Sequence, residues 1–332
     1  MRRMACRDHG EPERLTLEAD APAPEPADGE VAIDVAAAGL NYADTLMVAG
    51  SYQATPELPF APGLEVAGTV RALGAGVAGL QVGQRVLAIL DSGGFAEVAL
   101  ARAADVFPLP QTMDMVTAAG FPITYGTAHG ALVWRAQLKR GETLLVHGAA
   151  GGAGLAAVEV GKAMGARVIA TAGGPAKTAI AAEHGADQTI DYKTQDIRQT
   201  VKDLTDGQGA DVVFDPVGGE VFDASMRCIA WCGRIVVIGF ASGTVPQPKA
   251  NHLLVKNVSV MGLYWGSYRA RAPELMRRQF EDLFAWYASG WLHPLVSRTY
   301  PLEKAARALA DLKNRKATGK LVLRVQAEEG EG

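Results

Sequence analysis

The fold of this chain is decided by one stretch, TLLVHGAAGGAG at residues 143–154, in which a short apolar run passes into a glycine-rich turn. Gly148, Gly151 and Gly154 fall three residues apart, and a small-residue helix is expected to follow them. Glycines at this spacing allow a tight turn, let backbone N–H groups approach a pyrophosphate, and let the helix pack closely on the strand. A second candidate strand at 167–171 follows where a βαβ unit would place it. The stretch therefore predicts a dinucleotide-binding unit, with a glycine loop that binds no ligand as the alternative.

The pattern of apolar and polar residues along the chain predicts two domains. Residues 62–90 hold short strands separated by glycines, which indicates a β-barrel. Beyond residue 123, strands alternate with helical stretches, which is typical of a doubly wound parallel sheet. These strands are expected at 143–147, 167–171, 187–191, 211–215, 233–238 and 257–263. We predict a nucleotide-binding domain at 123–263, inserted into a barrel-like catalytic domain formed by 1–122 and 264–332.

Composition and charge exclude several classes of protein. The formal net charge is −4 and there is no basic block, which argues against nucleic acid or an anionic membrane as the main partner. No apolar run approaches the roughly 20 residues that a membrane-spanning helix needs. The three cysteines are odd in number and include no Cys-x-x-Cys, which favours a reducing cytosol. We therefore expect a cytoplasmic enzyme with a small-molecule substrate.

Several further motifs resemble those of the medium-chain dehydrogenases/reductases, and most of all the quinone oxidoreductases of the zeta-crystallin type. They are GLNYAD at 39–44, PGLEVAG at 62–68, VGQRV at 82–86, GETLLVHGAAGGAG at 141–154 and ATGKLVL at 317–323. The resemblance implies an α/β fold, in which a Rossmann domain is inserted into a GroES-like, partly open β-barrel domain. Glu159 departs from the branch, which usually has glutamine at that position.

The resemblance also implies a prediction about metal. The superfamily's alcohol dehydrogenases hold a catalytic zinc through a cysteine, the histidine of a Gly-His-Glu, and a further cysteine or histidine. Asn41 and Leu64 stand at the first two of these positions, and neither is a credible zinc ligand. The four-cysteine cluster of a structural zinc is also missing from the sequence. We therefore predict no metal, and this favours reduction of a quinone or an activated double bond over alcohol oxidation.

The residues after the second parallel strand favour NADPH as the cofactor. Folds that prefer NAD place an acidic residue at this strand end, where it accepts a hydrogen bond from the ribose 2′-hydroxyl. The sequence ATAGGPAK at 170–177 has no acid, and glycine N–H groups with Lys177 would attract a 2′-phosphate. Tyr192 matches a tyrosine that the family uses against the same phosphate. Lys177 could instead be a solvated helix residue, and Tyr192 a half-buried packing ring.

The resemblance implies further cofactor contacts. Asn41 and Thr127 resemble the polar pair near the nicotinamide carboxamide and ribose, whereas Gly239 and Phe240 resemble the loop against the nicotinamide. Plain packing is an equal alternative for Thr127 and Phe240. The predicted cofactor-binding residues are Asn41, Thr127, Gly148, Ala150, Gly151, Gly152, Ala153, Thr171, Gly173, Lys177, Tyr192, Gly239, Phe240 and Lys320.

The predicted reaction is hydride transfer from NADPH to a quinone, or to the β-carbon of an α,β-unsaturated carbonyl, in the cleft between the domains. The product anion needs a proton and hydrogen-bond donors. Tyr42 and Tyr52 are the candidate donors, with Asn41 polarising the acceptor. Leu46 replaces a tyrosine that is common in the branch. Because an unactivated tyrosine has a pKa near about 10, protonation by solvent stays an alternative.

Three functions remain open on the sequence alone: a quinone reductase, an enone or enoyl-thioester reductase, and a non-enzymatic NADPH-binding protein of the crystallin type. A coenzyme A thioester would need a basic rim, and the candidate residues for it are Arg269, Arg271, Arg277 and Arg278. The same arginines are equally interpretable as the solvated face of a helix. We expect a homodimer that pairs through an edge strand at Val258–Leu263. The aromatic residues of 264–268 are expected either to cap the substrate cleft or to lie in an interface.

Overall fold

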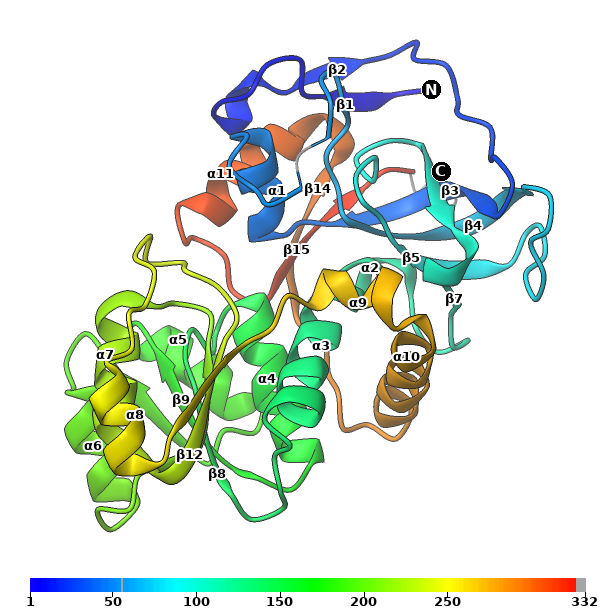
Figure 1. Ribbon diagram of the computed structural model, residues 1–332. Helices are drawn as coiled ribbons and strands as arrows, with labels where there is room; N and C mark the ends of the chain where they lie inside the picture. The colour runs from blue at the N-terminus through cyan, green and yellow to red at the C-terminus, as the bar shows by residue number, and fades with distance from the viewer. Residues whose placement is uncertain (55, 327–332) are drawn as a thin grey trace. The chain divides into compact units, whose positions relative to one another are not determined.

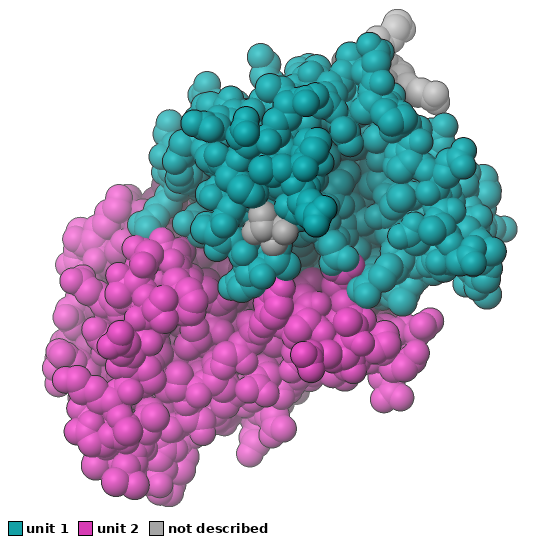
Figure 2. Space-filling model, turned by 45° about the horizontal axis from the view of Figure 1, so that its top comes forward, with its two compact units in different colours: residues 1–123, 294–332 teal, residues 124–293 magenta. Residues whose placement is uncertain are grey.

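The computed structural model describes residues 1–54 and 56–326. The chain forms two compact units, drawn in different colours in Figure 2. Unit 1 consists of Met1–Ile123 together with Pro294–Gly332, and unit 2 consists of Thr124–His293. Unit 1 is therefore discontinuous in sequence, and unit 2 is inserted into it.

Unit 2 is built on a six-stranded sheet in which all neighbouring strands are parallel, with the order β10-β9-β8-β11-β12-β13. The strands are β8 (Thr143–Val146), β9 (Arg167–Ala172), β10 (Gln188–Asp191), β11 (Ala210–Asp215), β12 (Ile229–Val237) and β13 (Ser259–Gly262). The strand order reverses between β8 and β11, and this is the place where such sheets bind ligands at their carboxyl ends. The predicted doubly wound sheet is confirmed.

Helices cover the faces of this sheet (Figure 1), so its central strands are buried on both sides. The helices that lie wholly in unit 2 are α4 (Gly152–Ala163), α5 (Pro175–Glu183), α6 (Ile197–Leu204), α7 (Gly219–Cys228), α8 (Ala250–Lys256), α9 (Tyr268–Arg271) and α10 (Pro273–Ala288). A further helix, α3 (Pro122–His129), begins in unit 1 and continues into the π-helix η3 (Gly130–Arg135) of unit 2. Leu145, Ile169 and Val213 are fully buried on adjacent strands. Because these strands are continuously apolar, the sequence pattern predicted their positions closely.

Residues 264–293, which the sequence analysis assigned to the catalytic domain, lie in unit 2. The reason is the packing of Trp265, which is 5 % exposed. A Cβ atom on Gly126 would lie 2.3 Å from the Trp265 ring, so the bare glycine admits the indole. Trp265 Nε1 donates to Gln279 Oε1 at 2.9 Å, and Gln279 Nε2 donates to the carbonyl of Gly126 at 2.9 Å. Trp265 is therefore a buried anchor of residues 264–293 within unit 2.

Unit 1 is built on a seven-stranded sheet with the order β14-β15-β3-β4-β5-β7, and β6 also pairs with β3. The strands are β3 (Glu30–Gly39), β4 (Glu65–Leu73), β5 (Arg85–Ile89), β6 (Val98–Arg102), β7 (Val106–Pro108), β14 (Val296–Pro301) and β15 (Lys320–Arg324), and a separate pair is formed by β1 (Arg3–Ala5) and β2 (Thr16–Glu18). All pairs are antiparallel except β14 with β15. The late strand β15 lies beside the early strand β3, which explains why the domain needs both ends of the chain.

The short helices of unit 1 pack around this sheet. They are η1 (Pro12–Arg14), α1 (Tyr42–Val48), η2 (Ala103–Asp105), α2 (Met115–Ala119), η5 (Leu302–Lys304) and α11 (Ala305–Lys313). The core contains Ile33 of β3, Val66 of β4 and Leu323 of β15, each nearly or completely buried. This is the GroES-like, partly open barrel that the resemblance implied. Among the described residues, no helix combines the length and the apolar character needed to span a membrane.

Candidate active site

The turn between β8 and α4 lets a ligand approach the backbone closely. Gly148 has φ +61°, a left-handed conformation that favours glycine. A Cβ atom on Gly154 would lie 2.3 Å from the carbonyl oxygen of Gly148, so only glycine lets the helix begin against the turn. Gly151, Gly152 and Ala153 are half-buried at this start, whereas Ala150 is 4 % exposed. The first N–H groups of the twelve-residue α4 and its positive dipole end suit a phosphate.

A buried histidine supports this turn from within unit 2. His147 Nδ1 lies 2.9 Å from Thr171 Oγ1, and its Nε2 lies 2.7 Å from Ser225 Oγ. Burial lowers the pKa of His147 to about 4, so the ring is neutral and structural near pH 7. Thr171 also accepts a main-chain hydrogen bond from Ala149 at 3.0 Å. Thr171, a predicted cofactor contact, is 1 % exposed and directs its hydroxyl to His147, so it supports the turn; its contact with a cofactor stays a prediction.

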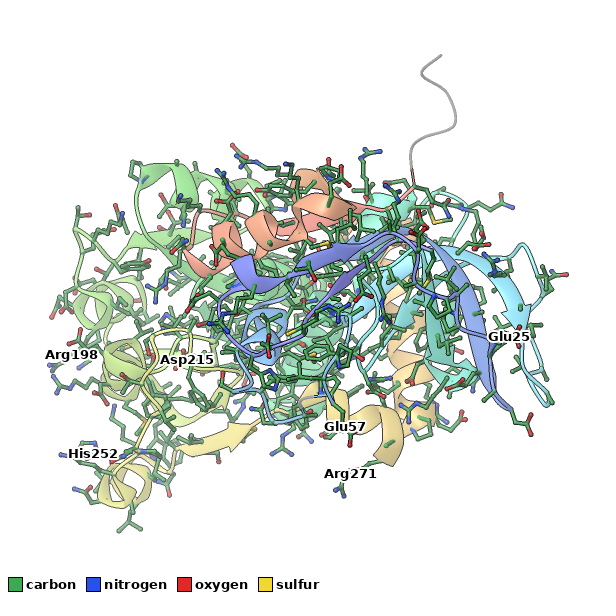
Figure 3. All side chains as sticks on the ribbon, turned by 90° about the horizontal axis from the view of Figure 1, so that it is seen from above. Glu25, Glu57, Arg198, Asp215, His252 and Arg271 are labelled. Carbon is green, nitrogen blue, oxygen red and sulfur yellow. The ribbon has the colours of Figure 1, made fainter. Side chains whose placement is uncertain are left out.

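Asp215 ends β11 on the other side of the switch point; it is labelled in Figure 3. Its Oδ1 accepts from the N–H groups of Val217 at 2.8 Å and Gly218 at 2.9 Å. This fixes a loop against the glycine turn, because a Cβ atom on Gly148 would lie 3.6 Å from Pro216. The sequence analysis did not predict Asp215 as a site residue. A signal was available, because Asp215 is an acidic residue at the end of an apolar strand and is followed by Pro-Val-Gly-Gly.

The loop after β9 holds the residues predicted to select NADP(H). A Cβ atom on Gly173 would lie 2.5 Å from the hydroxyl oxygen of Tyr192, so the phenol lies over a bare stretch of backbone. Lys177 lies in the first turn of α5, where its N–H donates to the carbonyl of Gly174 at 3.1 Å. Lys193, which was not predicted, brings its Nζ to 3.9 Å from the position of a Cβ on Gly174. The structure thus brings together Gly173, Tyr192 and a lysine that directly follows Tyr192.

An acidic residue from the neighbouring strand also reaches this loop. Asp191 ends β10, and its Oδ1 accepts from the N–H groups of Gly174 at 2.8 Å and Lys193 at 3.0 Å. These hydrogen bonds, first of all the one from Gly174, lower the pKa of the Asp191 carboxyl. The expectation that the loop glycines expose their N–H groups is therefore wrong for Gly174. The local sequence pattern does not reveal this contact, since Asp191 reaches the loop only through the pairing of β10 with Ala172 of β9.

Two further predicted contacts follow β12 at the carboxyl edge of the same sheet. Phe240 is 41 % exposed, and a Cβ atom on Gly239 would lie 3.6 Å from the carbonyl oxygen of Pro216. Ala241 donates a main-chain hydrogen bond to the same oxygen at 3.0 Å, so this loop is tied to the one after β11. Thr127 is half-buried on α3. Contact of these residues with a cofactor stays a prediction.

Glu159 is buried in α4, where its carboxylate accepts three hydrogen bonds. Tyr125 Oη donates at 2.7 Å and the N–H of His293 at 2.8 Å to Oε2, while His184 Nδ1 lies 2.5 Å from Oε1. Burial, with the Glu159 charge, raises the pKa of Tyr125. Glu159, which departs from the glutamine that the resemblance implied, therefore has its contacts in the interior of unit 2.

Unit 1 holds a second cluster of buried polar groups where β3 passes into α1. The N–H of Asn41 donates to Asp44 Oδ2 at 2.7 Å, and Asn41 Nδ2 donates to Glu65 Oε1 at 2.8 Å. Lys320 Nζ lies 2.6 Å from Glu65 Oε1, 2.9 Å from Asn41 Oδ1 and 2.7 Å from the carbonyl oxygen of Leu40. An ammonium has three hydrogens, so each has its own acceptor.

Glu65 anchors this cluster from the start of β4 and is fully buried. Its Oε2 accepts from the N–H of Ile123 at 2.9 Å. A Cβ atom on Gly39 would lie 2.4 Å from Glu65 Oε1, so glycine at this strand end makes room for the carboxylate. Glu65 was quoted as part of a motif but was not predicted as a site residue. Its role depends on contacts between three strands, which the local pattern does not reveal.

Asp44 is the second buried carboxyl of the cluster, and it accepts from the N–H groups of Asn41 and Gly63. Burial raises the pKa of Asp44 from its ordinary value to about 7; Lys320 opposes this rise and Glu65 adds to it. The cluster therefore contains a carboxyl that titrates near neutral pH.

The predicted proton donors follow Asn41. Tyr42 is the first residue of α1 and is 43 % exposed. Tyr52 is half-buried and packs against the apolar core of unit 1. The Tyr42 ring is open to solvent, whereas Tyr52 is held against the core; proton donation by either residue stays a prediction.

Residues 27–111 match the family "Alcohol dehydrogenase GroES-like domain", and residues 152–281 match "Zinc-binding dehydrogenase". A quinone oxidoreductase-like protein 2 homolog of Nematostella vectensis is 40 % identical over 325 residues, which is 97 % of this chain and 88 % of the relative. The quinone oxidoreductase of Rattus norvegicus is 33 % identical over 313 residues, 94 % of each chain.

The chain belongs to the quinone oxidoreductase family of medium-chain dehydrogenases/reductases. This family member is therefore an oxidoreductase. A solved structure of Escherichia coli quinone oxidoreductase complexed with NADPH matches it with a TM-score of 0.92 and 32 % identity, covering 98 % of this chain and 100 % of that one.

The name of the second matching family implies zinc, but the residues of this family member do not fit it. The amide oxygen of Asn41 already accepts from Lys320, and Leu64 offers no ligand atom. The Lys320 ammonium lies among the oxygens that a cation would use. Within residues 1–54 and 56–326, no three His, Cys, Asp or Glu side chains are grouped to hold a metal ion.

Proposed function

We propose that this quinone oxidoreductase family member binds NADPH and passes its hydride to a quinone. The observation that carries the proposal is the loop after β9, where the Tyr192 hydroxyl lies over Gly173 and the Lys193 ammonium lies near Gly174. A tyrosine hydroxyl and an ammonium together suit a 2′-phosphate, which NADPH has and NADH lacks. The NADPH complex of the Escherichia coli relative supports the same assignment.

The glycine turn and the start of α4 would hold the pyrophosphate through backbone N–H groups. The Asp191 carboxylate is already engaged by two N–H groups, so it is held in place at the edge of the phosphate loop. In the proposed complex the 2′-phosphate lies on the side of Tyr192 and the two lysines Lys177 and Lys193. When bound, the reduced nicotinamide supplies the hydride, and the protein supplies orientation.

Asn41 is the proposed donor to the acceptor oxygen. Its Nδ2 carries two hydrogens, and Glu65 takes one of them. The second hydrogen would polarise the quinone carbonyl and stabilise the negative charge that hydride addition places on that oxygen. Tyr42 or Tyr52 would then give the proton, with solvent as the alternative source.

Quinone reduction is favoured over enoyl-thioester reduction by the state of the arginine cluster. Arg269 is only 9 % exposed, so it belongs neither to a basic rim for coenzyme A nor to a solvated face. Arg271, Arg277 and Arg278 are exposed, and Arg277 lies 3.5 Å from Glu274. The basic surface is thus weaker than the sequence indicated.

The proposal is tested by NADPH oxidation with three acceptors: 1,4-benzoquinone, an alkenal and crotonyl-CoA. We expect turnover with the quinone and the highest kcat/KM for it. Turnover with crotonyl-CoA alone would assign the protein to thioester reduction. NADPH binding without turnover on any acceptor would favour the non-enzymatic, crystallin-like function.

We also propose a homodimer that pairs through Val258–Leu263. Strand β13 stands at the end of the sheet order, and β12 is its one strand partner among the described residues. An edge strand offers N–H and C=O groups to a second copy. Light scattering at micromolar concentration is expected to give twice the chain mass, and a monomer would contradict the proposal.

A further inference from the structure

We propose that Lys320 is a positioning residue, whose ammonium fixes the side-chain amide of Asn41 in one orientation. The inference rests on the proposed function, because it explains how Asn41 is presented to the quinone. It differs from the role implied by the family resemblance, in which Lys320 contacts the cofactor.

Hydrogen bonds within unit 1 occupy the ammonium of Lys320. The Lys320 side chain is 7 % exposed and reaches three oxygens, those of Leu40, Asn41 and Glu65, at 2.6–2.9 Å. These acceptors match the three hydrogens of the ammonium. Its hydrogen-bonding capacity is therefore used within unit 1, and a phosphate would have to displace one of these bonds.

The charged groups beside Asn41 determine the orientation of its side-chain amide. An ammonium only donates hydrogen bonds and a carboxylate only accepts them, so Asn41 must turn Oδ1 to Lys320 and Nδ2 to Glu65. The opposite amide orientation would place Nδ2 against the ammonium and Oδ1 against the carboxylate. The second hydrogen of Nδ2 therefore has a fixed direction before any substrate binds, which is the condition for electrostatic preorganisation.

The sheet explains why these three residues meet. Strand β3 lies between β15 and β4: Gly39 pairs with Val322 of β15, and Ala38 pairs with Val66 of β4. Lys320 at the start of β15 and Glu65 at the start of β4 consequently flank the end of β3, where Asn41 follows. The ion pair is buried, so removing one partner would leave an uncompensated charge.

The test begins with Lys320→Met, which keeps an unbranched side chain one atom shorter than lysine and removes the ammonium. We expect kcat with 1,4-benzoquinone at saturating NADPH to fall on the order of 100-fold, as for loss of one oriented donor. The Kd for NADPH should stay within about threefold, since the ammonium is spent within unit 1. Lys316→Met is the matched control, because Lys316 is a mostly exposed lysine on the same segment and lies 4.0 Å from Asp311; its kinetics should match the wild type.

Chemical rescue separates positioning from a general structural effect. Lys320→Ala lacks the equivalent of one propylammonium ion, so added propylammonium should restore kcat by about tenfold or more. Tetramethylammonium has the charge but no N–H group and should not restore it. Lys320→Met combined with Glu65→Gln removes both charges; we expect this double variant to fold, as judged by circular dichroism, and to keep the low kcat.

The outcomes that overturn the inference are distinct from failure of the proposed function. A Kd for NADPH that rises more than about tenfold in Lys320→Met, with kcat unchanged, would make Lys320 a cofactor contact. Wild-type kcat in the double variant, or equal rescue by both cations, would also overturn the inference. A wild-type protein without quinone turnover would instead refute the proposed function, and the positioning role with it.

Discussion

Adding one methyl group to the loop after β9 tests how the protein selects its cofactor. In Gly173→Ala, the new Cβ would lie 2.5 Å from the hydroxyl oxygen of Tyr192 and 2.8 Å from the adjoining ring carbon, so the phenol must move. The Tyr192 ring is 47 % exposed, and moving it costs little stability, within about 0.5 kcal/mol. The displaced hydroxyl, however, would no longer meet the 2′-phosphate.

The expected loss follows from one hydrogen bond to a charged group, about 1.5–3 kcal/mol. At about 1.4 kcal/mol for each factor of ten, NADPH should bind about 10- to 100-fold more weakly, whereas the Kd for NADH should not change. Tyr192→Phe is the matched variant, because it removes the hydroxyl without crowding the loop. Isothermal titration calorimetry with both nucleotides measures the two Kd values. Equal losses for NADPH and NADH, or an unchanged NADPH Kd in Tyr192→Phe, would refute the reasoning.

Three other variants test the turn, the proton donor and the buried acid. In Gly154→Ala the new Cβ would lie 2.3 Å from the carbonyl oxygen of Gly148. We therefore expect urea unfolding to show a stability loss of about 1–3 kcal/mol, and both nucleotides to bind more weakly. Wild-type stability and binding would contradict the close packing. Tyr52→Phe should lower kcat by on the order of 100-fold with its preferred acceptor, and unchanged turnover would remove Tyr52 from proton donation. Asp44 has an ordinary pKa of 3.8 and one of about 7 in the fold, so the folded state binds its proton more tightly. Its contribution to stability is fully present below about pH 4 and is lost as pH rises to about 7, by about 4 kcal/mol. Denaturant unfolding across this range should therefore show a smaller decline with pH in Asp44→Asn than in the wild type, and identical slopes would contradict the shifted pKa.

The parallel sheet was predictable because its signals are local. Strands β8 and β9 are short apolar runs bounded by turn residues, and the spacing from Gly148 to Gly154 specifies a strand, a turn and a helix in order. The packing of residues 264–293 in unit 2 was not predictable, since it depends on an indole that meets a glycine more than a hundred residues earlier. Sequence periodicity carries no information on such a contact.

The site shows the same division. The predicted partners Gly173 and Tyr192 do lie together, because parallel pairing places the ends of β9 and β10 side by side. The same pairing also brings Asp191 to the loop, where it engages an N–H that was expected to stay exposed. Lys320 was predicted as a cofactor contact, and the burial of its ammonium between three strands, which depends on the register of the sheet, was not predicted. Side-chain hydrogen bonding of this kind needs the tertiary structure.

The most direct measurement is the rate of NADPH oxidation by 1,4-benzoquinone before and after exhaustive treatment with a zinc chelator. We expect quinone-dependent oxidation at the same rate in both samples, since the buried lysine leaves no fitting place for a metal and the hydride comes from the nucleotide. A rate that disappears with the chelator and returns with added Zn²⁺, or no oxidation in either sample, would contradict it.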